Sequence, residues 1–165
     1  MKIFVICGSQ KFQFNRLIKA LDEQVGKGLI KADIFAQIGG SDYEPSNFKF
    51  KHFIDQDTFS ENIASADVII THSGTGSIMQ SINNGKKAIV VPRLAEHGEH
   101  VDNHQKQIAQ AFDESGLVIT CYDTDMLYEA VQKTEFFNPA EYKSNTDNVL
   151  FEIDSSINSL LGRWL

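Results

Sequence analysis

The stretch ADVIITHSGTGS, residues 66–77, joins an apolar run to a polar segment that contains two glycines. Apolar and β-branched residues in an unbroken run are typical of a strand that is buried on both faces of a sheet. The glycines end this run, and residues 77–84 then predict a helix that Gly85 closes. A strand, a loop and a helix in this order belong to an open α/β sheet, in which ligands bind where the strands end.

The same alternation extends over most of the chain. Strands are predicted at residues 2–7, 33–38, 48–53, 67–71, 87–91 and 117–120, and helices at 14–28, 58–66, 77–84, 102–114, 125–133 and 145–165. This favours an α/β fold, a Rossmann-like and mostly parallel sheet with helices on both faces. We expect residues 1–135 to form the domain, and residues 136–165 to be a linker and a helix that docks on a partner or on the domain itself.

Composition excludes several classes of protein. The chain has 165 residues, which suits one domain with one core. Its formal net charge of −7 argues against nucleic acid as the main partner, because that role needs a basic face. No apolar run approaches the ~20 residues that a membrane span needs. Cys7 and Cys121 both fall in apolar runs, so we expect buried, reduced thiols in a cytoplasmic protein.

Residues 73–77 (SGTGS) form the first candidate binding cluster. Glycines let the backbone approach a ligand closely, and the helix that follows offers free N–H groups and a partial positive charge to a diphosphate. The spacing is neither that of a Walker A loop nor that of a full dinucleotide-binding fingerprint, and a structural capping loop is the alternative. The turn at residues 8–10 (GSQ) is a similar candidate, or a plain turn between strand and helix. His72, at a strand end, fits packing as well as catalysis.

The richest polar patch is the segment at residues 96–105 (EHGEHVDNHQ). His100 and His104 are one helical turn apart, so they would share one face of a helix. A zinc site is one interpretation, although the spacing is not His-Glu-x-x-His and no cysteine joins the cluster. A solvated helix start is another, and side chains that bind a ligand are the interpretation we favour. Arg93 fits a contact with phosphate, a contact with an acidic partner, or a plain surface charge.

At these residues the chain resembles glycosyltransferase family 28, in the C-terminal, donor-binding half of the GT-B fold. The resemblance runs in order through residues 4–10, 66–77, 85–93 and 99–105, and covers roughly residues 1–120. It is strongest to the short members that consist of a single half. These are the catalytic subunit of the eukaryotic enzyme that adds N-acetylglucosamine to a dolichol-linked sugar, and the small subunits of bacterial exopolysaccharide or capsule glycosyltransferases.

The resemblance implies an inverting transfer of a hexose or N-acetylhexosamine from a UDP-sugar to a lipid-linked saccharide acceptor in polysaccharide biosynthesis. It implies no cofactor and no essential metal. It also implies a separate, membrane-associated glycosyltransferase subunit that binds the acceptor. That partner would hold this chain peripherally at the cytoplasmic, inner face of the membrane. A non-catalytic, nucleotide-binding subunit that enhances a partner transferase is the alternative.

The family's functional positions carry over onto matching residues of this chain. The residues expected to bind the donor are Gly8, Ser9, Gln10, Ser73, Gly74, Thr75, Gly76, Ser77, Gln80, Arg93, Glu99, Asn103 and Gln105. His100 and His104 are the candidate catalytic residues, acting electrostatically, while the general base is expected from the partner. The family usually has a glutamate that holds the ribose hydroxyls at the position of Gln80. An amide there keeps an acceptor but loses the charge-assisted hydrogen bond.

Overall fold

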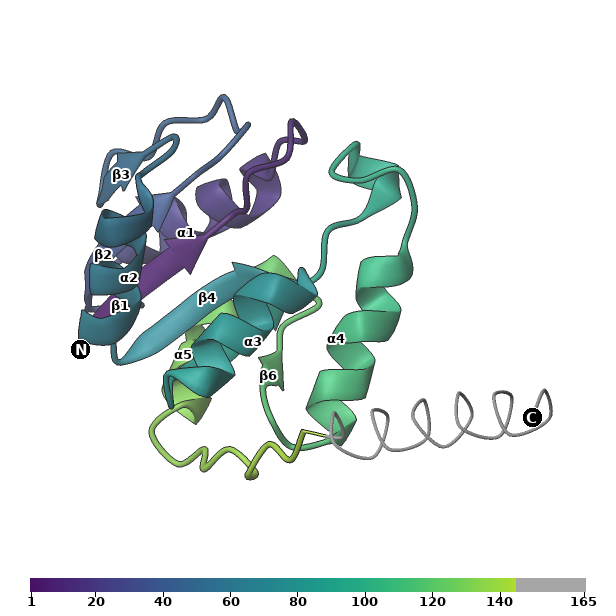
Figure 1. Cartoon of the computed structure of the whole chain (residues 1–165). Coiled ribbons are helices and arrows are strands. Elements are labelled where there is room, and N and C mark those ends of the chain that lie inside the picture. The colour runs from purple at the N-terminus through teal and green to yellow at the C-terminus, as the bar shows by residue number, and fades with distance from the viewer. Residues whose placement is uncertain (145–165) are drawn as a thin grey trace, which may run out of the picture.

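The computed structural model describes residues 1–144, and it confirms the expected α/β fold with a parallel sheet (Figure 1). The described strands are joined in one sheet in the order β3-β2-β1-β4-β5-β6, each parallel to its neighbour. Their bounds are Lys2–Ile6 (β1), Asp33–Gln37 (β2), Lys49–Lys51 (β3), Val68–His72 (β4), Lys87–Val91 (β5) and Ile119–Thr120 (β6). The α-helices are Asn15–Gly26 (α1), Gln56–Ser65 (α2), Thr75–Asn83 (α3), His104–Glu114 (α4) and Leu127–Lys133 (α5), and the short 3₁₀ turns are Ala95–His97 (η1) and Thr124–Met126 (η2).

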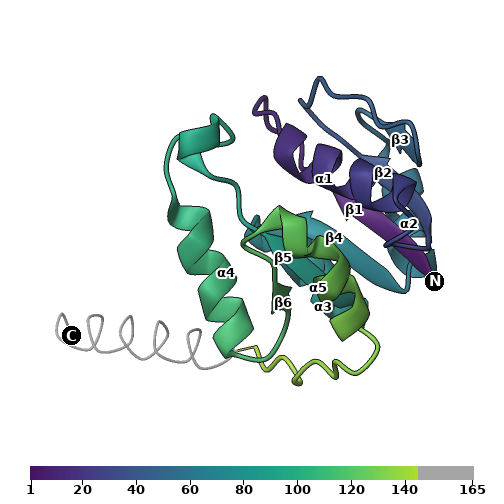
Figure 2. The ribbon, with the colours of Figure 1, turned by 180° about the vertical axis from the view of Figure 1, so that it is seen from behind.

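Alternation along the central strands explains why helices cover both faces of the sheet. Ile3 and Val5 of β1 belong to a core that contains apolar residues of α1 and α5. Phe4 and Ile6, which point the other way, pack with α2. On that second face, Val90 of β5 packs with α3 and α4. Figure 2, which is turned by 180° from Figure 1, shows α1 and α5 in front of the sheet.

The strand order places the loops after β1 and β4 next to each other. β1 pairs with β4, Ile6 lying opposite Thr71 at their carboxyl ends. From β1 the chain continues to β2 on one side, and from β4 to β5 on the other. This reversal is the topological switch point of a Rossmann fold, and ligands bind in the crevice outside it.

Each of the described α-helices begins one or two residues away from its predicted start, and the differences at α3 and α4 bear on the site. α3 begins at Thr75, two residues early, with Gly74 in extended conformation before it. The expected loop at residues 73–77 is therefore partly the first turn of a helix. α4 begins at His104, two residues later than predicted, with Asn103 at its N-cap. The carboxylate of Asp102 accepts the backbone N–H of His104 at 3.1 Å, a local bond that favours a turn at residues 102–104. His100 consequently lies outside this helix, contrary to the expectation that it shares a helical face with His104.

After α5, the described chain continues as coil beside the domain. The N–H of Ala140 donates to the carbonyl oxygen of Gly116 at 2.9 Å, which holds this coil against the turn between α4 and β6. The boundary after residue 135 stays a prediction, and the helix predicted at 145–165 lies outside the described residues. Cys7 and Cys121 are buried and unpaired, as expected. No helix within residues 1–144 has the length and apolar character needed to cross a membrane.

Candidate functional site

Two neighbouring cavities open at the carboxyl end of the sheet, and Gly8 lines both. The inner pocket has a volume of about 160 Å³, and the outer pocket about 260 Å³. The predicted residues that line the inner pocket are Gly8, Gln10, Ser73, Gly74, Thr75, Arg93, His100, His104 and Gln105. Those that line the outer pocket are Gly8, Ser9, Ser77 and Gln80. Gly76, Glu99 and Asn103 line neither cavity.

His72 occupies the space between two glycines in the inner pocket. A Cβ atom at Gly74 would lie 2.5 Å from its Nε2 atom, and one at Gly8, whose φ is +84°, would lie 2.9 Å from it. Both positions therefore need glycine, and both loops close tightly on the imidazole. Burial, reinforced by the positive charge of Arg93, lowers the pKa of His72 to about 4 and keeps the ring neutral at pH 7. From the sequence His72 fitted packing as well as catalysis, and its place between the two glycines could not be predicted because only the fold brings them to it.

Arg93 is a buried cation at the wall of the inner pocket, with only 2% of its surface exposed. Its guanidinium donates to the carbonyl oxygens of Phe12 and Glu99, both at 3.0 Å, and to that of Cys7. Among residues 1–144 no carboxylate forms an ion pair with it. Burial accordingly lowers the pKa of Arg93. The carboxylate of Glu99 acts on Arg93 electrostatically, but it is already paired with Arg16. Arg16, Glu99 and Arg93 together therefore keep a net positive charge, and this charge beside the pocket favours an anion.

Two polar atoms on this wall have no hydrogen-bond partner in the described part of the chain. They are Oγ of Ser73 and Nε of Arg93, both buried. Buried polar groups in proteins are nearly always paired, so these two atoms mark a side of the cavity where a polar ligand would find unused hydrogen-bonding capacity. Helix α3 begins beside them at Thr75, where backbone N–H groups without helical acceptors also favour an anion. These features suit a phosphate or diphosphate.

Glu99 was expected to contact a ligand, but the structure commits its carboxylate to protein donors. Its side chain is fully buried. The carboxylate accepts Nε and Nη2 of Arg16, both at 3.0 Å, and the backbone N–H of Leu94 at 2.9 Å. Arg16 is a partner that the sequence analysis missed, because it lies 83 residues away in α1. Glu99 therefore holds protein segments together and is withdrawn from both pockets.

Gln105 and Asn103 likewise make bonds within the protein. Oε1 of Gln105, which does line the inner pocket, accepts the backbone N–H groups of Ser73 and Arg93 and so joins the segments that follow β4 and β5. Oδ1 of Asn103 accepts the N–H of Ala95 at 2.9 Å. These bonds shape the walls, and direct contacts of these side chains with a ligand stay predictions.

Asp102 lies between the two candidate catalytic histidines. Its Oδ1 is 3.4 Å from Nδ1 of His100 and also contacts Nδ1 of His104. The hydrogen bond from the His104 side chain lowers the pKa of Asp102. The three ligand atoms lie within 4.8 Å of one another, so they are close enough to hold a metal ion. The positive charge of Arg93 and the start of α4 oppose a cation here, and the absence of a metal stays a prediction.

The outer pocket has a different chemical character. Ile54 and Phe59 give it an apolar side, while Gln37, Gln56 and Gln80 bring amide groups to it. An apolar surface with amide donors and acceptors suits a flat heterocycle that has a polar edge. The hydroxyls of Ser9 and Ser77 complete the lining. The two pockets together therefore suit a nucleoside joined to a phosphate group.

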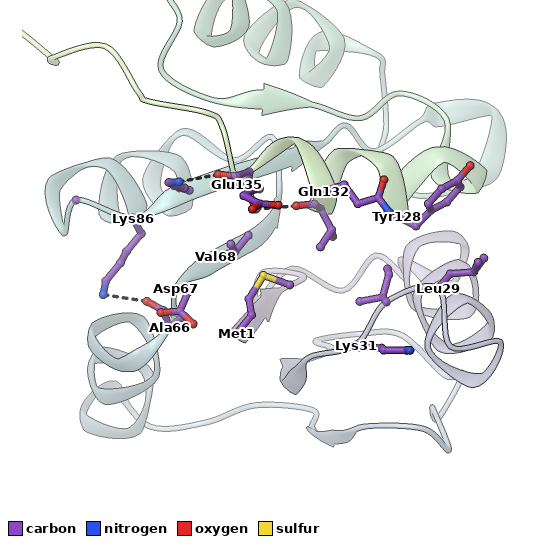
Figure 3. Close-up of a pocket in the computed structure, with 15 residues that line it drawn as sticks. Met1, Leu29, Lys31, Ala66, Asp67, Val68, Lys86, Tyr128, Gln132 and Glu135 are labelled. Carbon is purple, nitrogen blue, oxygen red and sulfur yellow. Dashed lines mark hydrogen bonds between the residues drawn. The ribbon is translucent and has the colours of Figure 1, made fainter.

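A larger cavity, of about 700 Å³, lies at the opposite, amino end of β1 and β4 (Figure 3). Besides Lys31, two lysines line it, and both are engaged by the protein: Nζ of Lys86 donates to the carbonyl oxygens of Ala64 and Ala66 at 2.6 and 2.9 Å, and Nζ of Lys87 donates to that of Thr134 at 2.6 Å. These bonds cap the carboxyl ends of α2 and α5, which carry partial negative charge. The amino end of the sheet is therefore a poor place for an anion. Although this cavity is larger than the two pockets at the carboxyl end, it is not the candidate site.

Comparisons with known proteins agree with this chemistry. The model of the glycosyltransferase family 28 C-terminal domain matches residues 2–160. The chain is 35% identical over 128 residues to the UDP-N-acetylglucosamine transferase subunit ALG13 of Kluyveromyces lactis, a match that covers 76% of this chain. The chain spans 60% of that relative's length and 40% of the corresponding protein of Candida glabrata. These relatives give no support to the exopolysaccharide or capsule class.

Solved structures confirm the fold. The solution structure of ALG13 matches with a TM-score of 0.58 and 23% identity, over 88% of this chain and 92% of that one. The crystal structure of MurG from Acinetobacter baumannii also matches with a TM-score of 0.58, with 21% identity, over 82% of this chain and 42% of that one. The smaller share of MurG agrees with the expectation that this fold forms half of a GT-B glycosyltransferase.

Proposed function

Because the chain belongs to the glycosyltransferase family 28 C-terminal domain family, we propose that it binds a UDP-sugar and is the catalytic, donor-binding subunit of a two-component inverting glycosyltransferase. The buried, unpaired charge of Arg93 on the inner pocket is the observation that carries the proposal. A diphosphate supplies the missing negative charge. It also supplies acceptors for Nε of Arg93 and Oγ of Ser73.

The arrangement of the pockets gives the proposed orientation of the donor. The diphosphate lies in the inner pocket, against the start of α3 and the backbone of Gly8. The nucleoside lies in the outer pocket, its base against Phe59 and Ile54 and its ribose near Gln80. His100 and His104 are on the side of the inner pocket formed by the segment before α4 and by α4 itself, where they reach the sugar or its phosphates.

In the proposed reaction an acceptor hydroxyl attacks the anomeric carbon of the UDP-sugar. The bond between that carbon and the phosphate oxygen breaks, and its electron pair leaves with UDP. Arg93 and the N–H groups at the start of α3 offset the charge that develops on this leaving group. These groups place positive charge beside the leaving UDP, so the proposed reaction uses no metal ion.

The names of the relatives suggest the sugar and the need for a partner. They are called subunits of a UDP-N-acetylglucosamine transferase, so UDP-N-acetylglucosamine is our first choice among UDP-hexoses and N-acetylhexosamines. We also propose a membrane-associated partner subunit that binds a lipid-linked saccharide acceptor and provides the general base. Such a partner would place this chain at the cytoplasmic face of a membrane.

Calorimetric titration of the purified chain tests donor binding. UDP and a panel of UDP-sugars are titrated with and without Mg²⁺, and CMP serves as a control nucleotide with one phosphate. We expect UDP and UDP-N-acetylglucosamine to bind equally well without Mg²⁺, and CMP to bind more weakly. No binding of UDP at millimolar concentration would contradict the proposal.

A non-catalytic subunit that enhances a partner transferase is the second candidate, and Gln80 favours it. Gln80 lines the outer pocket without the charge that a carboxylate would offer to ribose hydroxyls. The two candidates differ in the purified two-subunit complex. Ser77→Ala, on the wall of the same pocket, lowers turnover if this chain holds the donor, whereas an enhancer tolerates the damaged pocket.

A further inference from the structure

The segment between β5 and α4 carries His100 and is tied to the start of α1 at several points. The Arg16 guanidinium binds both carboxylate oxygens of Glu99 and also donates to the carbonyl oxygen of Pro92 at 2.8 Å. Nε2 of Gln13 donates to the carbonyl oxygen of His97 at 2.8 Å. Figures 1 and 2 show the loop before α1 and the segment before α4 rising side by side beyond the sheet.

The ion pair between Arg16 and Glu99 is the strongest of these ties. It is bidentate, and the side chains are 18% and 0% exposed. A buried ion pair is poor evidence for added stability, because removing two charges from water offsets their attraction. What such a pair does secure is geometry, since a guanidinium and a carboxylate meet in one plane and in few orientations.

Glu99 transmits this geometry to the inner pocket in two ways. Its backbone carbonyl oxygen accepts Nη1 of Arg93 at 3.0 Å, so Glu99 is one of the three acceptors, with Cys7 and Phe12, that hold the buried cation in place. The next residue is His100, which lines the pocket and packs on the ring of Phe12 with a centroid distance of 5.4 Å. One carboxylate thus sets the places of a charge and of a ring on the pocket wall.

We infer that Arg16 and Glu99 are positioning residues for the donor site: the pair, here called the clasp, holds Arg93 and His100 where a diphosphate binds. This inference rests on the proposed function, because it assigns the clasp to the same site. Neither side chain lines the inner or outer pocket, so the clasp acts through Arg93 and His100 and makes no contact with the ligand.

The test measures UDP binding to the full chain by calorimetry, beside thermal unfolding. We expect Glu99→Gln and Arg16→Gln to raise the Kd for UDP about tenfold, the lower end of the losses seen when residues that orient metal ligands are removed. Arg16→Lys keeps the charge without the planar fork and should recover part of the affinity. Glu23→Gln is the matched control, since Glu23 forms an exposed ion pair with Lys27 on the same helix. It should leave the Kd unchanged.

A double variant separates positioning from stability. Arg16→Met with Glu99→Leu replaces the buried pair by apolar side chains, an exchange that commonly keeps or raises stability. Under our inference the melting temperature falls only by the cost of the lost bonds to the Leu94 N–H and the Pro92 carbonyl oxygen, while the Kd for UDP remains raised. Hydrogen exchange should also quicken at residues 94–103 but stay unchanged in the sheet.

Each failure has its own signature. If the wild type binds UDP and the folded variants bind it within twofold of the wild type, the inference is wrong and the proposed function stands. Recovery of both stability and UDP affinity in the double variant would likewise assign the pair a purely structural role. If the wild type binds no UDP, the proposed function fails, and the inference fails with it.

Discussion

The backbone N–H groups of Ser73 and Arg93 share one acceptor, Oε1 of Gln105, at 3.2 and 3.0 Å. The amide of Gln105 thereby joins the segments after β4 and β5 without a ligand. The side-chain atoms of the same two residues, Oγ of Ser73 and Nε of Arg93, are left without partners. The backbone N–H groups of this wall therefore have hydrogen-bond partners within the protein, whereas these two side-chain atoms have hydrogen-bonding capacity left for a ligand.

Ser73→Ala should therefore separate binding from stability. The hydroxyl has no bond to lose in the free protein, so we expect the free energy of unfolding to stay the same or rise by up to about 1 kcal/mol. UDP affinity should fall about tenfold, because the ligand loses a donor. Urea unfolding and calorimetry measure the two quantities. The control is Ser41→Ala, which removes the buried acceptor of the Phe14 N–H. It should lower the free energy of unfolding by about 1–2 kcal/mol without weakening UDP binding.

Gly74→Ala and Gly76→Ala should behave differently although they lie two residues apart. A methyl group at Gly74 meets the ring of His72, so we expect the free energy of unfolding to fall by about 1–3 kcal/mol and UDP binding to be lost. At Gly76 a methyl group has nothing within 4 Å, and the residue lies in α3. Alanine there should preserve stability and weaken UDP binding only if the ligand approaches that backbone. Equal stability of the two variants would refute the tight fit of His72.

Stability should fall as the solution is acidified below pH 7, because His72 is buried in its neutral form. The unfolded chain takes up a proton on this imidazole near pH 6.5, whereas the folded chain does so near pH 4. This contribution is fully present above pH 6.5 and is lost as the pH falls towards 4. It amounts to about 2 kcal/mol between pH 7 and pH 5. Urea unfolding at both pH values should show a smaller loss for His72→Gln, whereas a variant of the exposed His97, His97→Gln, should keep the full loss.

Metal analysis tests the histidine cluster independently. Because Arg93 and the start of α4 oppose a cation beside His100, we expect the purified chain to retain no stoichiometric zinc. UDP affinity should be the same with and without EDTA. One zinc ion per chain that is lost in His104→Ala would show that Asp102 and the two histidines form a metal site. That result would contradict the proposal that the reaction needs no metal.

The sequence predicts strands better than it predicts what their ends contact. Strand β5 has the expected bounds, because its apolar run is delimited by polar residues and Pro92. The environment of Arg93 could not be foreseen, since its three acceptors come from residues 7, 12 and 99. Glu99 appeared to be a ligand contact because its neighbours in the sequence are polar, yet its partner is Arg16 in another helix. Contacts between residues that are far apart in the sequence decide the roles of Arg93 and Glu99, and local sequence patterns do not predict such contacts.

The same limit explains the misplaced helix starts, including those of α3 and α4 beside the site. Sequence places the glycines correctly, but whether a residue belongs to a loop or to the first helical turn depends on which groups bond its N–H. At α4 the Asp102 carboxylate accepts the N–H of His104, and the helix begins at residue 104 where the sequence predicts 102. The pocket lining was predicted more fully than the element bounds, because the carboxyl ends of β1 and β4 meet wherever these helices begin.

Under the proposed function, nucleotide binding at Arg93 would link the concentration of nucleotide to the survival of the folded chain. A ligand that binds only the folded state stabilises it by about 2.7 kcal/mol at a hundredfold excess over its Kd. A chain of this size has a modest margin against unfolding, so such a contribution alters how often proteases meet an open form. Cells depleted of the nucleotide would then lose the protein itself as well as its turnover, and the abundance of the protein would follow the metabolic supply of its ligand.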